Sequence, residues 1–237
     1  MQSQSRILIF GASGAIGSEI CKTFSTNNWN TVAVSRASAN FTTEATSHLT
    51  FDPFASQAGP DVFDEHAPYN AVCWAQGSNV SDNICSVDID EHLAIYQANC
   101  LYILATLKVL LNRHLLAPNA KLCIISSIWQ NLARQDKLSY CMSKAALQGL
   151  VLSATADLAK DGIFINAILP GALDTPMTRK NVAPDQLEKL TNATYFNRLP
   201  ALQDVANLAF FLCSPQNTGI TGQFIGADLG FSHVRLL

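Results

Sequence analysis

The stretch Phe10-Gly11-Ala12-Ser13-Gly14-Ala15-Ile16-Gly17 follows an apolar run at residues 7–10 and begins an amphipathic segment at residues 15–25. A glycine-rich turn in this position, between a strand and a helix, is typical of dinucleotide binding. The chain can turn tightly at Gly11, the helix can pack closely on the strand at Gly17, and N–H groups at the helix start can receive a pyrophosphate. A plain turn of small residues is the alternative. We expect a cofactor phosphate site at Gly11, Ser13, Gly14, Ile16 and Gly17.

Short apolar runs alternate with amphipathic segments along nearly the whole chain. The runs that we expect to be strands are residues 7–10, 31–34, 49–51, 71–75, 122–126, 163–169 and 223–225. The segments that we expect to be helices are residues 15–25, 91–114, 139–160, 185–190 and 203–213. Strands that are apolar on both faces belong in a parallel sheet covered by helices. The sequence predicts an α/β fold, a Rossmann-like doubly wound three-layer sandwich of about seven parallel strands with helices on both faces.

No linker, internal repeat or charge run divides the chain, so we expect one NAD(P)-binding domain over residues 1–237. Residues 51–69 leave little room between strands, and the crossover helix there should be short or distorted. The connection that follows the sixth expected strand is long and rich in proline. Long connections at the carboxyl end of a parallel strand often cover a binding site, so we expect a substrate lid around residues 171–199.

The composition restricts the possible partners. Hydrophobic residues make up 49% of the chain and charged residues 14%, against about 25% charged in an average domain. This excludes a disordered chain and favours additional buried surface between subunits. With 15 Lys and Arg against 18 Asp and Glu, there is no basic excess for binding nucleic acid. The most apolar stretch, residues 100–111, is interrupted by Lys108 and is too short to span a membrane, so we expect no membrane partner.

Seven cysteines are scattered along the chain, and no two of them form a C-x-x-C pair. Neither a metal site nor a disulfide framework is therefore indicated. Several lie in apolar runs, where a thiol acts as a small hydrophobic group. Together with the absence of a visible secretory segment at the N-terminus, this favours a cytoplasmic protein.

The second expected strand, residues 31–34, is followed by Ser35-Arg36. An NAD site usually places a carboxylate near this strand end, where it binds the 2′-hydroxyl of the adenosine ribose. No acidic residue is present here, and a guanidinium group suits a 2′-phosphate. Arg36 therefore favours NADP(H), with NAD(H) possible. A solvated surface arginine is the alternative.

Tyr140 and Lys144 lie four residues apart near the start of an expected helix, which puts both side chains on one face. Such a pair arises often by chance and is weak evidence alone. It gains weight from Ser127, which lies at the end of the expected strand before that helix.

These motifs together resemble the short-chain dehydrogenase/reductase family, in its compact single-domain branch, including members like 3-oxoacyl-carrier-protein reductase. The resemblance runs from about residue 6 to residue 231. Ser127, Tyr140 and Lys144 match the family's Ser and Tyr-x-x-x-Lys, and Asn99 matches the Asn of the preceding helix. Further matches in chain order are Pro170-Gly171, Thr175 and Thr221-Gly222-Gln223.

The resemblance implies an NADP(H)-dependent oxidoreductase that interconverts a ketone and a secondary alcohol on a small-molecule or acyl substrate. Tyr140 would donate or accept the proton, and the positive charge of Lys144 would lower the pKa of its phenol. Lys144 would also bind the nicotinamide ribose. Ser127 would hold the carbonyl oxygen, and Asn99 would help to organise a water-linked proton path.

The same resemblance assigns further cofactor contacts. Thr175 and the backbone of Leu173 should contact the nicotinamide carboxamide. Asp52 should reach the adenine amino group, although a turn aspartate before Pro53 is the alternative. Gly77 should border the adenine ribose. The complete set of expected contacts adds Gln76, Tyr140, Lys144, Pro170 and Gly171.

The chain departs from the family pattern at several positions. Phe10 stands where threonine is usual, and Ala15 replaces the second glycine of the turn. Trp74-Ala75-Gln76-Gly77 replaces a common Asn-Asn-Ala-Gly, which puts in doubt a hydrogen bond between neighbouring strands. Asp228-Leu229-Gly230 replaces a usual Asp-Gly-Gly. None of these changes removes a proton-transfer group.

Several alternatives stay open. The substrate is expected to be a small free ketone or sugar-like carbonyl, with an acyl-carrier ketone next. Trp129 lies close to Ser127 in sequence and either lines the substrate pocket or packs in the core or an interface. A non-catalytic nucleotide-binding regulatory protein on the same fold is the alternative function, and a sugar-nucleotide epimerase of the longer branch would need a longer chain. We expect a homodimer or homotetramer, since relatives often pair the equivalent helices.

Overall fold

A computed structural model describes residues 4–36, 44–55, 59–175, 178 and 184–234. Within them, seven strands form one parallel sheet in the order β3-β2-β1-β4-β5-β6-β7. The strands are β1 (Arg6–Phe10), β2 (Asn30–Ser35), β3 (Ser47–Thr50), β4 (Tyr69–Trp74), β5 (Leu116–Ile125), β6 (Phe164–Pro170) and β7 (Phe224–Ala227). This confirms the expected doubly wound α/β sheet. Strand β5 begins earlier than its apolar run because its first residues continue the ladder with β4.

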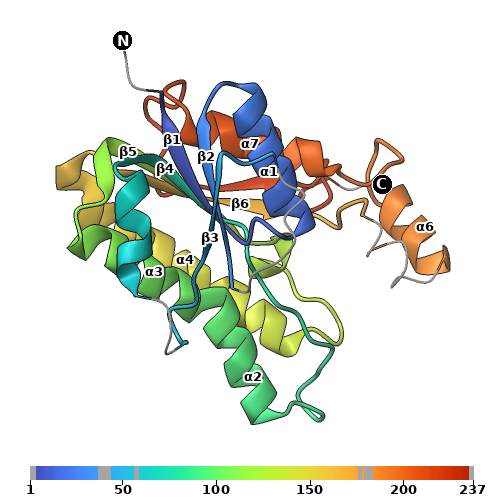
Figure 1. Ribbon diagram of the computed structural model, residues 1–237. Coiled ribbons are helices and arrows are strands. Elements are labelled where there is room, and N and C mark those ends of the chain that lie inside the picture. Colours follow the sequence, from blue (N-terminus) through green and yellow to red (C-terminus); the bar gives the residue numbers. More distant parts are fainter. Residues whose placement is uncertain (1–3, 37–43, 56–58, 176–177, 179–183, 235–237) are drawn as a thin grey trace.

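Helices cover both faces of the sheet (Figure 1). One face carries α1 (Ala15–Thr26) and α7 (Leu202–Cys213), and the other carries α2 (Ile89–Tyr96), α3 (Tyr102–Asn112) and α4 (Leu138–Leu158). The short crossover between β3 and β4 is a 3₁₀ helix, η1 (Pro60–His66), as its length predicts. Helix α6 (Pro184–Asn192) stands away from the sheet within the expected lid segment.

The strands are apolar on both faces because each face has its own core. Leu8 and Phe10 of β1 pack into the core under α3 and α4, whereas Ile7 and Ile9 pack into the core under α1 and α7. All four side chains are fully buried. Such strands give continuous hydrophobic runs rather than an alternating pattern. The two cores hold the carboxyl ends of the strands at a common edge.

Phe10 and Trp74, two of the departures from the family pattern, are partners. They are paired in register across β1 and β4, and their rings stack at 5.7 Å between centroids and 5° between planes. The indole Nε1 of Trp74 donates a hydrogen bond of 2.8 Å to the hydroxyl of Thr106 on α3. Phe63 and Tyr102 meet the ring of Phe10 edge-on. Aromatic packing between β1 and β4 and the hydrogen bond from Trp74 to α3 thus take the place of the inter-strand hydrogen bond that the sequence put in doubt.

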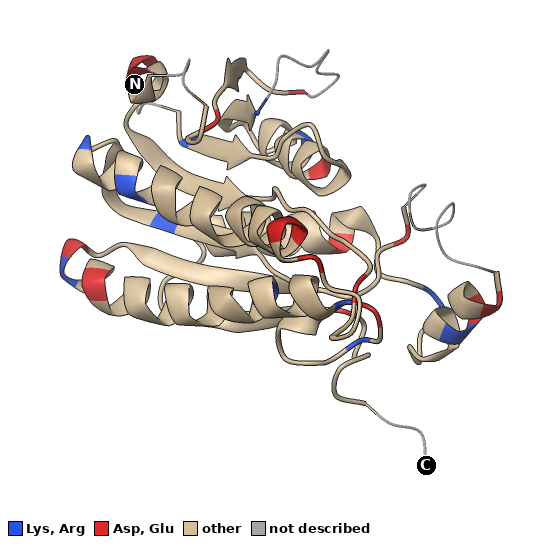
Figure 2. Cartoon of the chain, turned by 90° about the horizontal axis from the view of Figure 1, so that it is seen from below, with Lys and Arg blue, Asp and Glu red and all other residues tan. Residues whose placement is uncertain are grey.

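The expected long helix at 91–114 is interrupted by a π-helical turn, η2 (Gln97–Leu101), between α2 and α3. The continuous helical stretch Ile89–Asn112 is long and apolar enough to cross a membrane by composition alone, yet 44% of its apolar window is buried within the protein. Tyr102, Ile103 and Leu110 bury their side chains against the sheet. Figure 2 shows few charged residues along this layer of helices. A core helix of a folded domain has this pattern.

Candidate active site

The carboxyl ends of the strands gather the residues that the sequence singles out. From β1 to β6 these are the turn at 11–17, Arg36, Asp52, Gln76 with Gly77, Ser127, and the group Pro170, Gly171, Leu173 and Thr175. The strand order reverses between β1 and β4, and ligands of doubly wound sheets bind at this edge beside such a switch point. Tyr140, Lys144 and Asn99 reach the same edge from the helices.

The glycine turn lies directly against the end of β4. Gly11 has φ +74°, and a Cβ atom there would lie 2.4 Å from the backbone nitrogen of Gln76. A Cβ atom on Gly17 would lie 2.3 Å from the carbonyl oxygen of Gly11. Both positions therefore exclude any side chain. The N–H groups of Gly11 and Ala12 donate to the carbonyl oxygen of Val34, at 3.0 and 3.2 Å, which ties the turn to β2.

The side-chain amide of Gln76 is buried beside this turn, and neither its nitrogen nor its oxygen has a hydrogen-bond partner in the described part of the chain. Buried polar groups without partners are rare in native proteins because each costs about 1–3 kcal/mol. A polar ligand at this edge would supply the missing partners. The turn, which excludes side chains at Gly11 and Gly17, and the unpartnered amide of Gln76 together fit a dinucleotide.

Arg36 and Asp52 lie in one corner of this edge, and both act on Tyr102. The pKa of Tyr102 is raised, mainly by burial and also by the charge of Asp52, while the charge of Arg36 lowers it. Arg36 is exposed at the end of the second strand. Asp52 Oδ1 accepts a 3.0 Å hydrogen bond from the N–H of Phe54, as a turn aspartate does. Asp52 therefore acts as a turn aspartate through Oδ1. Its other carboxylate oxygen, Oδ2, takes no part in that hydrogen bond.

Ser127, Tyr140 and Lys144 meet at the end of β5. The Ser127 hydroxyl forms a hydrogen bond with the Tyr140 side chain and accepts one of 3.2 Å from the N–H of Trp129. Lys144 is 4% exposed, and its Nζ donates a 3.0 Å hydrogen bond to the carbonyl oxygen of Ile125. The same Nζ lies 5.7 Å from the centroid of the Tyr140 ring.

Asn99 joins this group because the π turn carries its side chain inward. Its Oδ1 accepts a 2.7 Å hydrogen bond from the N–H of Ser78. Its Nδ2 donates to the Ser78 carbonyl oxygen at 3.0 Å and to the Ser143 hydroxyl at 2.8 Å. A Cβ atom on Gly77 would lie 3.3 Å from Asn99 Oδ1 and 3.6 Å from Lys144 Nζ. The loop after β4 is thus fastened between Asn99 and Lys144.

Burial sets the acidities in this group. It lowers the pKa of Lys144 from 10.5 to about 8, partly offset by the nearby Cys100 thiol. It raises the pKa of Tyr140, and the hydrogen bond with Ser127 opposes that rise. Burial outweighs that hydrogen bond, so the net shift in the pKa of the phenol is upward, and the expected lowering of this pKa by Lys144 stays a prediction. Tyr140 is therefore a protonated phenol at neutral pH.

Pro170 and Gly171 close the site on the β6 side. The N–H of Gly171 donates to the carbonyl oxygen of Ala227 at 3.2 Å, which joins this turn to β7. Leu173 is buried, and the Thr175 hydroxyl lies 2.9 Å from that of Thr178. Residues 176–177 and 179–183 of the expected lid lie outside the described residues.

Three residues that the sequence does not single out fasten the start of α4. The buried carboxylate of Asp82 accepts a 3.1 Å hydrogen bond from the N–H of Ser139 and a second from its hydroxyl. Nδ1 of His92, on α2, lies 2.8 Å from the same hydroxyl. A carboxylate at a helix start is favourable for the helix dipole. These hydrogen bonds fix the backbone immediately before Tyr140. Asp82 and Ser139 are 57 positions apart, so no local pattern could have paired them.

Comparison with known proteins places the chain among oxidoreductases. A family model described as Enoyl-(Acyl carrier protein) reductase matches residues 64–232. The uncharacterized oxidoreductase YmfI of Bacillus subtilis is 27% identical over 94% of this chain and 97% of its own length. The 7alpha-hydroxysteroid dehydrogenase of Escherichia coli K12 is 38% identical over 92 residues, which are 39% of this chain and 36% of that enzyme.

Solved structures share the fold. A gluconate 5-dehydrogenase from Burkholderia cenocepacia, in complex with NADP and tartrate, superimposes with a TM-score of 0.87 at 22% identity, covering 98% of this chain and 96% of its own. At that identity the likeness concerns the fold alone.

The buried ammonium of Lys144 predicts a specific dependence of stability on pH. The pKa of Lys144 is 10.5 in the unfolded chain and about 8 in the folded chain. Between these values the unfolded state binds more protons, so the free energy of unfolding should rise with pH, by about 3 kcal/mol in total. Below pH 8 both states are charged and this contribution is flat. Urea unfolding of the wild type and of Lys144→Met at several pH values measures the difference. The exposed control Lys160→Met should run parallel to the wild type, and a parallel Lys144→Met curve would contradict the prediction.

Proposed function

Because the chain belongs to the short-chain dehydrogenase/reductase family, we propose that this oxidoreductase uses NADP(H) to interconvert a ketone and a secondary alcohol on a small-molecule or acyl substrate. Members of the family bind NAD(P) and act on small molecules. The observation that carries the proposal is the gathering of Ser127, Tyr140, Lys144 and Asn99 at one sheet edge, beside a turn that excludes side chains at Gly11 and Gly17.

The bound nicotinamide supplies or accepts the hydride. In the direction of reduction, the carbonyl oxygen gains negative charge and needs a proton. Tyr140 donates that proton, since the raised pKa of its phenol keeps it protonated at neutral pH. The Ser127 hydroxyl, held by the N–H of Trp129, orients the carbonyl oxygen next to the phenol.

Lys144 and Asn99 support Tyr140 in different ways. With a pKa of about 8, Lys144 carries a positive charge at pH 7 and stabilises the phenolate left after proton transfer. Both protons of the Asn99 amide are engaged, by Ser78 and Ser143. Its side chain therefore positions the loop after β4, and a water path behind Lys144 would use other atoms of Asn99. In the direction of oxidation, Tyr140 must lose its proton, which a bound cofactor and Lys144 would have to favour.

The preference for NADP(H) rests on Arg36, an exposed guanidinium at the end of β2 where an NAD site would carry an acid. The gluconate 5-dehydrogenase of the same fold was solved with NADP, which supports binding of this cofactor. NAD(H) remains the second cofactor, since the remaining expected contacts do not involve the 2′ position.

We further infer that the chain is a single cytoplasmic domain with a substrate lid around residues 171–199. All seven cysteines are free thiols, and five of them are buried, which suits a reducing compartment. Fractionation of cells that express the tagged protein tests the location. The protein is expected in the soluble fraction, with its cysteines reduced.

Oligomer formation rests on an apolar helix surface, defined by Leu93, Leu101 and Leu104 of the α2–α3 stretch with Met142 and Leu152 of α4. These side chains are between 40% and 57% exposed. Most members of the family form oligomers. A surface of this kind on a protein with few charged residues indicates contact with another copy of the chain.

Replacing Tyr140 by Phe removes the proton donor and leaves the packing of the ring. Turnover of a ketone with NADPH should fall by a factor of about 10²–10⁴, while the dissociation constant for NADPH changes little. Steady-state kinetics and calorimetric titration measure the two quantities. Tyr96→Phe, which removes a phenol hydroxyl on α2, is the matched control. Unchanged turnover would refute the role of Tyr140, and tight nucleotide binding without turnover in the wild type would favour the non-catalytic alternative.

Replacing Arg36 by Asp should weaken NADPH binding by roughly tenfold or more, because a charge-assisted contact becomes a repulsion. NADH, which lacks the 2′-phosphate, should lose much less. Titration of both nucleotides into the variant measures the ratio. Lys160→Asp makes the same change of charge in the 3₁₀ turn Ala159–Asp161 that follows α4, and it should leave the ratio unaltered. An equal loss for both nucleotides would show that Arg36 does not contact the phosphate.

Introducing Glu at Leu104 and Leu152 together should dissociate the oligomer. Sedimentation velocity at micromolar concentration should give the wild type a mass above the 25.6 kDa of one chain. The variant should have a mass close to that value. Phe211→Glu on α7 places the same charge on the other side of the sheet and should not dissociate it. A wild type that sediments as a single chain would overturn the proposal.

A further inference from the structure

Helix α4, which carries Tyr140 in its first turn, is capped by a residue from another part of the chain. Lys137, which precedes the helix, gives it no side-chain hydrogen bond among the described residues. Helix starts leave N–H groups without intrahelical partners. Asp82 takes the first two: its carbonyl oxygen accepts from the N–H of Leu138 at 3.2 Å, and its Oδ1 accepts from the N–H of Ser139 at 3.1 Å. The loop after β4 thus supplies the cap of the helix that holds the proton donor.

Further hydrogen bonds join the same loop to the residues just before α4. The N–H of Asp82 donates to the carbonyl oxygen of Asp136 at 3.3 Å. The ammonium group of Lys137 donates to the carbonyl oxygen of Val80 and to the hydroxyl of Ser81, both at 3.0 Å. Main-chain and side-chain bonds therefore hold the loop alongside the first turn of α4. A shift of that turn would break several of them together.

The hydrogen bonds around Ser139 run in one direction. Its hydroxyl donates to the carboxylate of Asp82, which can only accept. A hydroxyl has a single proton, so Ser139 must accept from His92, whose Nδ1 lies 2.8 Å away. Nδ1 of His92 therefore carries the hydrogen. The chain runs from the His92 ring through the Ser139 hydroxyl to the Asp82 carboxylate.

The inner part of this chain is buried. Ser139 has no exposed surface, and Asp82 is 6% exposed. A carboxylate at this depth is costly unless its oxygens receive hydrogen bonds, and both oxygens receive theirs from Ser139. Burial lowers the pKa of Lys137, and the nearby charge of Asp82 opposes that shift. The cap is thus a fixed feature of the interior and resists displacement.

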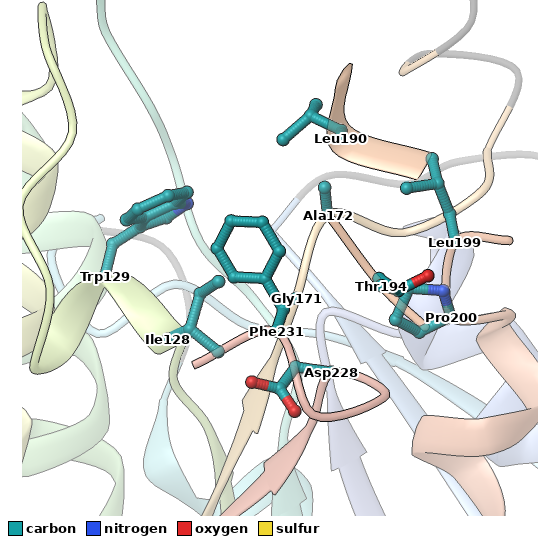
Figure 3. Close-up of a pocket in the computed structure, with 10 residues that line it drawn as sticks. All are labelled: Ile128, Trp129, Gly171, Ala172, Leu190, Thr194, Leu199, Pro200, Asp228 and Phe231. Atoms are coloured by element: carbon teal, nitrogen blue, oxygen red, sulfur yellow. The ribbon is translucent and has the colours of Figure 1, made fainter. Parts of the chain in front are cut away.

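The partner of Tyr140 is held from a different direction. The Ser127 hydroxyl accepts from the N–H of Trp129 at 3.2 Å. The Trp129 ring packs edge-to-face on Phe231, which follows β7, with 6.2 Å between centroids (Figure 3). Ser127 is therefore fixed by residues at the sheet edge, whereas Tyr140 moves with α4. The hydrogen bond between Ser127 and Tyr140 depends on where the first turn of α4 stands.

We propose that Asp82, Ser139 and His92 are positioning residues for the proton donor, which set the place of the first turn of α4 and hold the Tyr140 hydroxyl against Ser127. This inference rests on the proposed function and deepens it, because it adds three residues that act on the reaction through Tyr140. Asn99 has a separate part, since it holds the start of the same loop at Ser78.

The direction of the chain predicts the tautomer of His92. At about pH 8.5, where an ordinary histidine is neutral, the ring should carry its hydrogen on Nδ1. In Asp82→Asn the amide Nδ2 would donate to the Ser139 hydroxyl, which would then donate to His92, so the ring should change to the Nε2–H form. Long-range ¹H–¹⁵N spectra of histidine-labelled protein read the tautomer, and His92→Asn identifies the signal. A wild-type ring in the Nε2–H form, or a tautomer that does not respond to Asp82→Asn, overturns the chain.

The positioning role predicts a loss of turnover with little loss of cofactor binding. Asp82→Ala should lower kcat for reduction of ethyl acetoacetate with NADPH by about 10–100-fold, because a small displacement of a reacting group can cost that much. The dissociation constant for NADPH should change by less than about threefold, since Asn99 still holds the start of the loop. Steady-state kinetics and calorimetric titration measure the two quantities.

The outer end of the chain gives a milder and independent test. His92→Leu should lower kcat roughly threefold to tenfold, the effect of one lost hydrogen bond. His92→Asn, whose amide N–H can replace Nδ1–H, should restore kcat to within about twofold of the wild type. This pair decides the role even where Asp82→Ala does not fold.

Tyr69→Phe is the matched control, because it removes a buried hydrogen bond of 2.8 Å to the carbonyl oxygen of Phe63 at the amino end of β4. It should lower the melting temperature and leave kcat unchanged, with all assays run well below the lowest melting temperature. Wild-type kcat in both Asp82→Ala and His92→Leu, or a loss in His92→Leu that His92→Asn does not restore, overturns the positioning role and leaves the oxidoreductase intact. A wild type that binds NADPH but reduces neither ethyl acetoacetate nor cyclohexanone overturns the proposed function and this role with it.

Discussion

The buried ammonium group of Lys144 is the constraint around which this edge of the sheet is arranged. A charge removed from water needs fixed polar or aromatic neighbours, or it loses its proton. The carbonyl oxygen of Ile125 and the face of the Tyr140 ring supply them. The loop after β4 must then pass close by, which it does at Gly77 because a side chain there would crowd both Lys144 and Asn99. The π turn in the α2–α3 stretch brings Asn99 to that loop.

Connections far apart in sequence hold the site more than the sheet does. The sheet brings strand ends to one edge, but the backbone before Tyr140 is fixed by Asp82 from the loop after β4 and by His92 from α2. The glycine turn is fixed by Val34 of β2 and by the backbone of Gln76. A small cavity is lined by residues that follow β5, β6 and β7. The glycine turn is thus joined to the ends of β2 and β4, while the start of α4 is joined to α2 and to the loop after β4.

The sequence predicts the parts of this arrangement that repeat or that lie close together along the chain. Apolar runs separated by amphipathic segments predict the parallel sheet, and the turn at 11–17 predicts its ligand edge. The spacing of Tyr140 and Lys144 predicts their common helix face. The π turn at Asn99, the contact of Asp82 with Ser139, and the unpartnered Gln76 amide depend on tertiary packing, which no local pattern carries. The burial that raises the pKa of Tyr140 likewise depends on tertiary packing.

The stacked pair of Phe10 and Trp74 has a consequence for how this chain could have diverged from relatives with a threonine and an asparagine at these positions. Neither replacement is independent of the other. A tryptophan at 74 beside a threonine at 10 would lack the ring that covers it, and an asparagine at 74 beside Phe10 would leave that ring without its stacked indole. Steps in either order pass through a less stable intermediate. Sequences that carry one aromatic residue without the other should therefore be rare, and the pair can serve as a lineage marker for a distinct subgroup.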